Sequence, residues 1–140
     1  MLNYRNEAAF SKVVCSHFRT AGFMVQRIES GITSKGIPDI FMCNKQHPVV
    51  WLELKRQHTT LKPTGFYNII DWRPGQQAWM FDFFVNTGIV CYTIACFNDI
   101  IAVIPMNKIY INNRVDVSQG VFLCSNIRHL ALPSCPRVSL

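Results

Sequence analysis

The sequence has no uninterrupted apolar stretch of the roughly 18 to 20 residues that a membrane-spanning helix needs, although 49% of its 140 residues are hydrophobic. Near the N-terminus there is no apolar segment followed by a small-residue cleavage site, so nothing indicates secretion. Internal repeats, low-complexity tracts and linker-like segments are also missing. These absences predict one soluble domain over residues 1–140, located in the cytoplasm and without a membrane partner.

The six cysteines include no CxxC pair, and four of them lie inside apolar runs. Disulfides are rare in the cytosol, so we expect reduced thiols that pack in the core. Cys43, His47 and His58 lie close enough along the chain to suggest zinc, but their spacing fits no closed zinc site. Structural zinc is therefore the less favoured interpretation.

Acidic residues are scarce, with eight Asp and Glu against fourteen Lys and Arg, and the net charge is +6. Ten of the fourteen basic residues lie in residues 1–73, together with five of the eight acidic ones. A basic surface suits the phosphate backbone of nucleic acid, although many basic proteins bind none. The charge alone therefore makes nucleic acid a candidate partner.

Hydrophobic periodicity predicts a helix over residues 4–21, capped by Asn3 and ended by Gly22. A strand at 23–29 and a loop at 31–36 follow, and two further strands at 38–43 and 49–55 form an antiparallel hairpin. Residues 56–73 are polar and irregular, which predicts a mobile loop.

A second helix is expected to begin at Pro74, to run to about Asn86 and to stop at Gly88. Strands at 89–96 and 100–104 then pair about a turn at Asn98-Asp99. The core thus covers about residues 4–105, and 106–140 form a C-terminal extension with no assigned structure. This order of elements predicts the α/β class, with a mixed central sheet flanked by helices.

The strand at 49–55 carries the candidate chemistry. Its side chains alternate between two faces, so Val50, Leu52 and Leu54 belong in the core while Glu53 and Lys55 point the other way. Asp39 begins the neighbouring strand and can approach them across the hairpin. A strand face with alternating charges is often only solvated, and such short motifs are common by chance.

An acidic pair with a lysine is nevertheless a chemically complete set for cutting a phosphodiester. Two carboxylates can hold Mg²⁺ or Mn²⁺ and leave coordination positions open for phosphate and water. A lysine beside the ion can orient or deprotonate the nucleophile, or stabilise charge in the transition state.

Several segments together resemble the PD-(D/E)xK nuclease superfamily. The pattern is Gly36-Ile37-Pro38-Asp39, thirteen intervening residues and Glu53-Leu54-Lys55. The flanking segments resemble the VRR-NUC branch and small phage nucleases, and Holliday-junction resolvases are close in pattern; these segments are Arg27-Ile28-Glu29-Ser30 and Arg73-Pro74-Gly75-Gln76-Gln77-Ala78-Trp79. The resemblance covers about residues 7–95, with the insertion between Lys55 and Arg73 as a departure.

The resemblance implies a restriction-endonuclease-like core and a site that binds Mg²⁺ or Mn²⁺. The implied metal ligands are the carboxylates of Glu7, Asp39 and Glu53 and the backbone carbonyl of Leu54. The implied catalytic residues are Asp39, Glu53, Lys55 and Gln76. Two alternatives stay open: Glu7 as a solvent-facing residue of the first helical turn, and Gln77 in place of Gln76.

Basic residues near the motif are candidates for contacts with nucleic acid: Lys35, Arg56, Lys62 and Arg73. In residues 56–73 they are interleaved with aromatic residues, a composition typical of nucleic-acid-contacting loops, although a disordered polar loop is an equal alternative.

We therefore expect a metal-dependent DNA endonuclease, phage-encoded by its resemblance, that cuts a junction, a flap, a nicked duplex or a specific sequence. Cutting both strands calls for two sites, so a homodimer is expected. The alternative is a catalytically silent nucleic-acid-binding module on the same fold.

Overall fold

The computed structural model describes residues 1–28, 36–64 and 67–133. In these ranges a six-stranded sheet has the order β1-β2-β3-β5-β6-β8, and β4 and β7 form a second sheet of two strands. The elements are α1 (Glu7–Thr20), β1 (Met24–Arg27), β2 (Ile40–Cys43), β3 (Val50–Arg56), β4 (Asn68–Ile69), α2 (Gln76–Thr87), β5 (Tyr92–Cys96), β6 (Ile101–Pro105), the 3₁₀ helix η1 (Ile111–Asn113), β7 (Arg114–Val115), β8 (Phe122–Cys124) and the 3₁₀ helix η2 (Ile127–His129).

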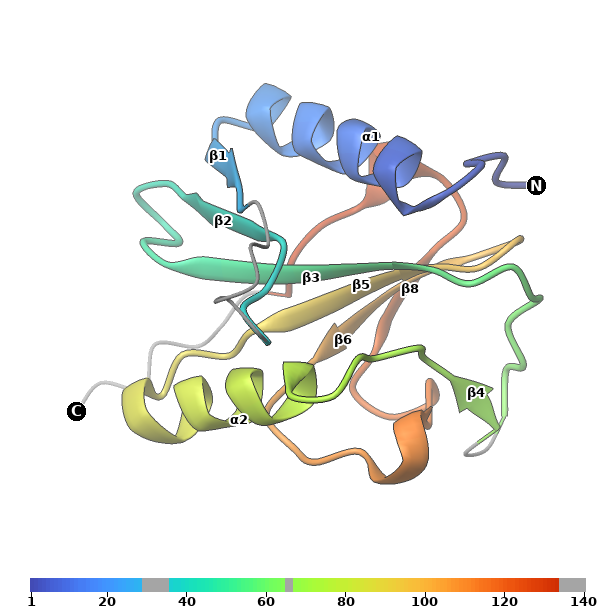
Figure 1. Cartoon of the computed structure of the whole chain (residues 1–140). Helices are drawn as coiled ribbons and strands as arrows, with labels where there is room; N and C mark the ends of the chain where they lie inside the picture. The colour runs from blue at the N-terminus through green and yellow to red at the C-terminus, as the bar shows by residue number, and fades with distance from the viewer. Residues whose placement is uncertain (29–35, 65–66, 134–140) are drawn as a thin grey trace.

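The large sheet is mixed and has a helix on each face. β3 and β5 are parallel, and the other neighbouring strands in this sheet are antiparallel. Helix α1 covers one face, while α2 and the small β4–β7 sheet lie on the other (Figure 1). This arrangement confirms the predicted fold class, including the hairpin of β2 and β3, in which Ile40 pairs with Leu52.

Helix α1 begins later than the sequence predicted. Asn6, with extended φ and ψ, is the N-cap, and its Oδ1 accepts a hydrogen bond of 2.9 Å from the Ala9 amide. The prediction of Asn3 as the cap is therefore wrong, because Asn6 offers a carbonyl oxygen at the correct distance along the chain. The helix then buries Phe10, Val14 and Phe18 against the sheet.

Strand β3 is buried on both faces. Val50, Leu52 and Leu54 join the hydrophobic cluster under α1, as the alternating pattern predicted. Glu53 and Lys55 are also buried, with exposed fractions of 1% and 4%. They are therefore not part of an ordinary solvated strand face.

Residues 57–64 and 67–73 lie within the segment predicted as an irregular, mobile loop, but they contain β4 and several buried side chains. Leu61, Ile70 and Trp72 are buried in the cluster on the α2 face. The Asn68 side chain accepts from the Lys62 amide at 2.8 Å and donates to the Lys62 carbonyl at 2.6 Å. This structure could not be predicted from the sequence, because the apolar residues are too sparse to show a period and the partner strand of β4 lies far along the chain.

The segment after Met106, for which no structure was predicted, completes the large sheet. β8 pairs with β6, and Val115, Val117 and Leu130 are buried. His17 Nε2 of α1 donates a hydrogen bond of 2.6 Å to the Leu130 carbonyl. Residues 106–133 are thus packed into the same cores as the strands before them.

Helix α2 begins at Gln76 instead of Pro74, because Gly75 precedes it in the left-handed conformation with φ of 90°. Gly88 ends the helix in the same conformation, as predicted. Among the described residues, no helix combines the length and apolar character needed to cross a membrane.

Candidate active site

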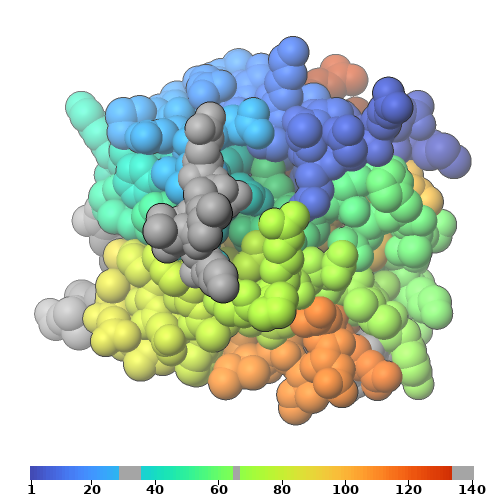
Figure 2. Space-filling view, in the orientation of Figure 1, coloured from blue at the N-terminus to red at the C-terminus, as the bar shows by residue number. Residues whose placement is uncertain are grey.

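A cleft of about 210 Å³ lies between α1 and the beginning of α2, with β3 at its base. In the space-filling view, α1 (blue) and the segment that leads into α2 (yellow-green) lie on either side of it (Figure 2). The residues that line it include all the predicted catalytic and metal-binding residues; the set is Glu7, Ala8, Ser11, Arg27, Ile28, Asp39, Glu53, Leu54, Lys55, Arg73 and Gln76.

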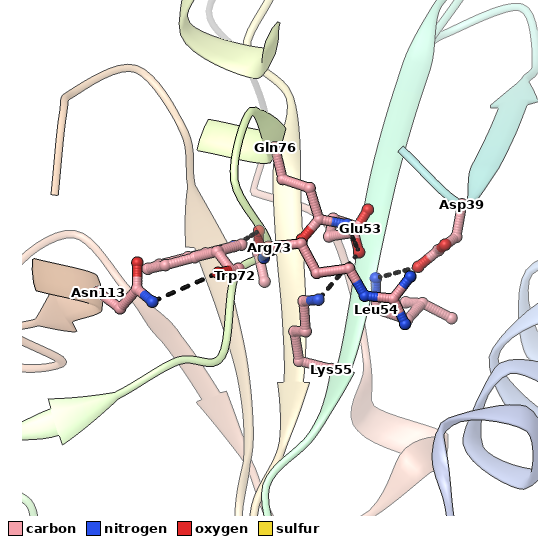
Figure 3. Close-up of polar contacts among 9 residues, drawn as sticks. Asp39, Glu53, Leu54, Lys55, Trp72, Arg73, Gln76 and Asn113 are labelled. Atoms are coloured by element: carbon pink, nitrogen blue, oxygen red, sulfur yellow. Dashed lines mark hydrogen bonds and ion pairs between the residues drawn. The ribbon is translucent and has the colours of Figure 1, made fainter. Parts of the chain in front are cut away.

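Three of these side chains meet above β3 and the start of β2. Lys55 Nζ lies 3.4 Å from Glu53 Oε1. Asp39 Oδ2 accepts a hydrogen bond of 3.0 Å from the Leu54 amide, which fixes the start of β2 against β3 (Figure 3). The hairpin thus brings the two carboxylates and the ammonium group to one place, as the alternation of β3 predicted.

Gln76 orients Glu53 from the first turn of α2. Its Nε2 donates a hydrogen bond of 2.9 Å to Glu53 Oε1, while its Oε1 accepts one of 2.9 Å from the Arg73 amide. Gln77 instead donates to Asn113 Oδ1 at 2.7 Å. Of the two glutamines left open by the sequence, Gln76 is therefore the one that contacts the acidic pair.

The environment of Glu53 disfavours its charged form. Burial raises its carboxyl pKa to about 8; the charge of Asp39 adds to this rise, and Lys55 opposes it. Oε2 of Glu53 is buried and has no hydrogen-bond partner among the described residues. A carboxylate in this position is stabilised either by a proton or by a bound cation.

The site fits a divalent cation held by few protein ligands. In the described part of the chain, no three side chains of His, Cys, Asp or Glu are close enough to form a metal-binding group. Mg²⁺ typically uses one or two carboxylates and keeps several waters. Asp39 and Glu53 supply such a pair, and within the described residues Glu53 Oε2 has no hydrogen-bond partner.

Glu7 lies at the rim of the same cleft and is solvent-exposed. Partial burial raises its carboxyl pKa; Lys55 acts in the opposite direction and Asp39 raises the pKa further. Glu7 is therefore within electrostatic reach of the site residues, but in this structure it does not form a three-carboxylate group with Asp39 and Glu53. Its place is that of the first-turn carboxylate of α1.

The four predicted nucleic-acid contacts differ in their surroundings. Arg73 is exposed and lines the cleft, and Lys62 is exposed in the segment before β4. Lys35 lies outside the described residues. Arg56 instead uses its guanidinium within the protein, donating to the carbonyls of Tyr4, Gln57 and Cys96 and to Asn98 Oδ1 at 2.6–3.1 Å. We assign Arg56 a structural role.

Asn113 supports the site and was missed in the sequence. It lies in the left-handed region, with φ of 57°, directly after Asn112 with φ of 53°. Its carbonyl accepts from the Ile70 amide at 2.9 Å, and its Nδ2 donates to the Trp72 carbonyl at 3.4 Å. With the bond from Gln77, Asn113 holds the segment that carries Arg73 and Gln76. The adjacent asparagines were the available signal, because Asn tolerates this backbone conformation.

Gly36 of the motif is in direct contact with the beginning of α2. Its φ is +86°, and a Cβ atom added to it would lie 2.6 Å from the Gly75 carbonyl oxygen. Side chains rarely adopt this φ and could not fit here. The glycine therefore allows the segment before Asp39 to pack against the segment before Gln76.

No protein-family model matches the chain, and a search of curated proteins finds no match. Among solved structures, Hjc from Archaeoglobus fulgidus, a Holliday junction resolvase from an archaeal hyperthermophile, matches with a TM-score of 0.57 and 16% sequence identity. The match covers 79% of this chain and 88% of that one. The chain thus has the fold of this resolvase, a mixed sheet flanked by helices.

Proposed function

We propose that this chain is a metal-dependent DNA endonuclease of the PD-(D/E)xK type. The observation that carries the proposal is the cluster of buried Glu53 and Lys55 with the partly buried Asp39, in which one carboxylate oxygen of Glu53 has no partner among the described residues. Burying a carboxylate and an ammonium group costs free energy, so a purely structural role would be better served by apolar residues.

Asp39, Glu53 and the Leu54 carbonyl are the proposed ligands of Mg²⁺ or Mn²⁺, with Glu7 assisting from the rim. When bound, the ion would neutralise charge on the scissile phosphate and lower the pKa of an attacking water. Gln76 holds Glu53 in its orientation through the 2.9 Å hydrogen bond.

Lys55 and Arg73 are proposed to act on the DNA itself. The Lys55 ammonium, held beside Glu53, orients the water and donates a hydrogen bond to the phosphate as negative charge develops there. Arg73 at the exposed edge of the cleft is proposed to bind a neighbouring phosphate. Lys62, and Lys35 outside the described residues, stay proposed as further phosphate contacts from the sequence.

Branched DNA is the first substrate to test, because the resolvase with the same fold is described as acting on Holliday junctions. We also propose a single domain over residues 1–140 and a homodimer, since one domain offers one such site and a junction or duplex has two strands to cut. The VRR-NUC affiliation, the phage origin and a cytoplasmic location stay predictions from the sequence.

The decisive experiment measures cleavage of labelled junction, flap and duplex DNA with Mg²⁺ or Mn²⁺. Lys55→Ala is expected to lower the rate by roughly 10²–10⁴-fold, and EDTA to abolish cleavage. Lys45→Ala, which removes an exposed lysine of the β2–β3 turn, is the matched control and should cleave normally. Cleavage that survives Lys55→Ala would refute the mechanism. DNA binding without cleavage by the unmodified chain would favour the silent binding module.

A further inference from the structure

The small β4–β7 sheet presents an apolar face to solvent beside the cleft. Asn68 and Val115 pair and are buried, while Ile69 and Arg114 form the next pair and are exposed. The exposed fraction is 57% for Ile69 and 69% for Tyr67, which precedes it by two residues. Tyr67 lies in the turn directly before β4, so these two exposed side chains are close together along the chain at the edge of the small sheet.

Charged residues of both signs lie near this face. Arg114 pairs with Ile69 and lines a hollow of about 390 Å³, together with Lys108, Asp116 and Ile111, and Ile111 is 74% exposed. Asp71, two residues after Ile69, is also exposed. Figure 2 shows β4 (green) and the segment of η1 (orange) on the same side of the molecule as the cleft. We call Tyr67, Ile69, Ile111 and Arg114 the ribbon face.

The ribbon face is firmly connected to the active site. Ile69 precedes Arg73 by four residues, a span of at most about 14 Å or four nucleotides of a B-form strand. Trp72, between them, donates from Nε1 to Thr93 Oγ1 at 3.0 Å and stacks on Tyr110 with ring centroids 5.5 Å apart. These contacts hold the segment between Ile69 and Arg73 against the core.

We propose that the ribbon face binds unpaired or unstacked DNA bases close to the phosphate that is cut; this inference rests on the proposed function. Tyr67, Ile69 and Ile111 cannot hydrogen-bond to phosphates through their apolar surfaces, but such side chains stack on bases or wedge between them. Arg114 and Lys108 supply the positive charge that the flanking phosphates need. The ribbon face thereby selects DNA with a branch, gap or flexible step.

DNA is preferred as the occupant for two reasons. Ile69 lies four residues before Arg73, which lines the cleft, and in the neighbouring hollow the two basic residues Lys108 and Arg114 outnumber the acidic Asp116. A partner that used only apolar contacts would gain nothing from Arg114 and Lys108 at this edge.

The test compares two DNA molecules in the cleavage-deficient Lys55→Ala chain: a labelled branched DNA and an uninterrupted duplex of the same length. Fluorescence anisotropy measures both dissociation constants. Adding Tyr67→Ser and Ile69→Ser should weaken binding of the branched DNA about tenfold, and binding of the duplex less than twofold. Val85→Ser is the matched control, because Val85 of α2 is also an apolar residue with 62% exposure.

Thermal unfolding checks that each variant is folded, and Arg114→Gln provides a second variant that removes no apolar side chain. If the Lys55→Ala chain binds branched DNA equally well with and without Tyr67→Ser and Ile69→Ser, the proposal for the ribbon face is overturned. The nuclease proposal would still stand in that case. An equal loss with Val85→Ser, or a change of oligomeric mass in the double variant, would also overturn the proposal for the ribbon face. Failure of the unmodified chain to bind or cleave any DNA would instead refute the proposed function.

Discussion

At the scale of single residues, Glu53 combines features that a stable protein normally avoids. It is buried, lies close to a second carboxylate and leaves one oxygen without a partner among the described residues. Lys55 and Gln76 contact only the other carboxylate oxygen of Glu53, Oε1. The pattern of β3 predicted which face Glu53 lies on. It could not predict that Glu53 is buried, because the residues that cover it belong to α2 and to other segments outside β3.

The pKa of Glu53 predicts a pH dependence of stability. The carboxyl pKa is about 8 in the folded chain and near 4.5 when unfolded, so between these values the unfolded chain loses its proton first. Stability should therefore fall as pH rises from about 4.5 to 8 and then level off. Glu53→Gln removes this contribution and should be more stable than the unmodified chain at about pH 8.5, by a few kcal/mol.

Denaturant titrations in EDTA at about pH 5 and pH 8.5 measure this difference. Asp82→Asn, at an exposed position of α2, controls for the loss of a negative charge and should show no such trend. A stability difference between Glu53→Gln and the unmodified chain that does not change with pH would contradict the raised pKa.

At the scale of elements, the site depends on how α2 is placed against β3 and the segment before β2. The helix boundaries were predictable within a few residues, because Gly88 and the apolar pattern give local signals. The placement was not predictable. It depends on contacts between distant parts of the chain, namely Gly36 with Gly75 and Asn113 with Gln77.

Gly36→Ala is expected to destabilise the fold and lower activity together. The new Cβ would require φ of +86° and would lie 2.6 Å from a backbone oxygen, which together should cost about 2–4 kcal/mol. Gly22→Ala is the control, since Gly22 has φ of +94° but open space around it. Thermal unfolding should show a clearly larger drop for Gly36→Ala; equal drops would mean that the contact with Gly75 is unimportant.

Asn113→Ala and Asn113→Gly should both lower kcat about tenfold, the order expected when a few hydrogen bonds that position a catalytic group are lost. Both variants remove the side-chain bonds to Gln77 and Trp72, whereas glycine keeps the left-handed backbone. Glycine should therefore recover stability but not kcat, with KM unchanged in both. Steady-state cleavage with Asn112→Gly as the control tests this, and full recovery of kcat by glycine would show that only the backbone conformation matters.

At the scale of the whole molecule, the order of helices and strands up to residue 105 was predictable except for β4, and the resemblance identified most of the charged residues that line the cleft. The structure of residues 57–64, 67–73 and 106–133 was not predictable, because β4 pairs with β7 and β8 with β6 across long stretches of sequence. Short strands of two or three residues carry too little periodicity to be recognised alone.

The net charge of +6 predicts steep salt dependence of DNA binding. The logarithm of the dissociation constant should rise linearly with the logarithm of salt concentration, because bound phosphates release counterions. Arg73→Gln should reduce the slope by about one. Anisotropy titrations from low to moderate salt measure it, and Arg128→Gln, at an exposed position of η2, should leave the slope unchanged. A slope that Arg73→Gln does not alter would place Arg73 away from the DNA.

The late position of Asn113, β7 and β8 in the chain has a consequence for protein synthesis. The acidic pair and its lysine leave the ribosome long before the segments that hold Arg73 and Gln76 and close the sheet. A nascent chain therefore cannot complete the proposed site until residues 111–124 have also been synthesised.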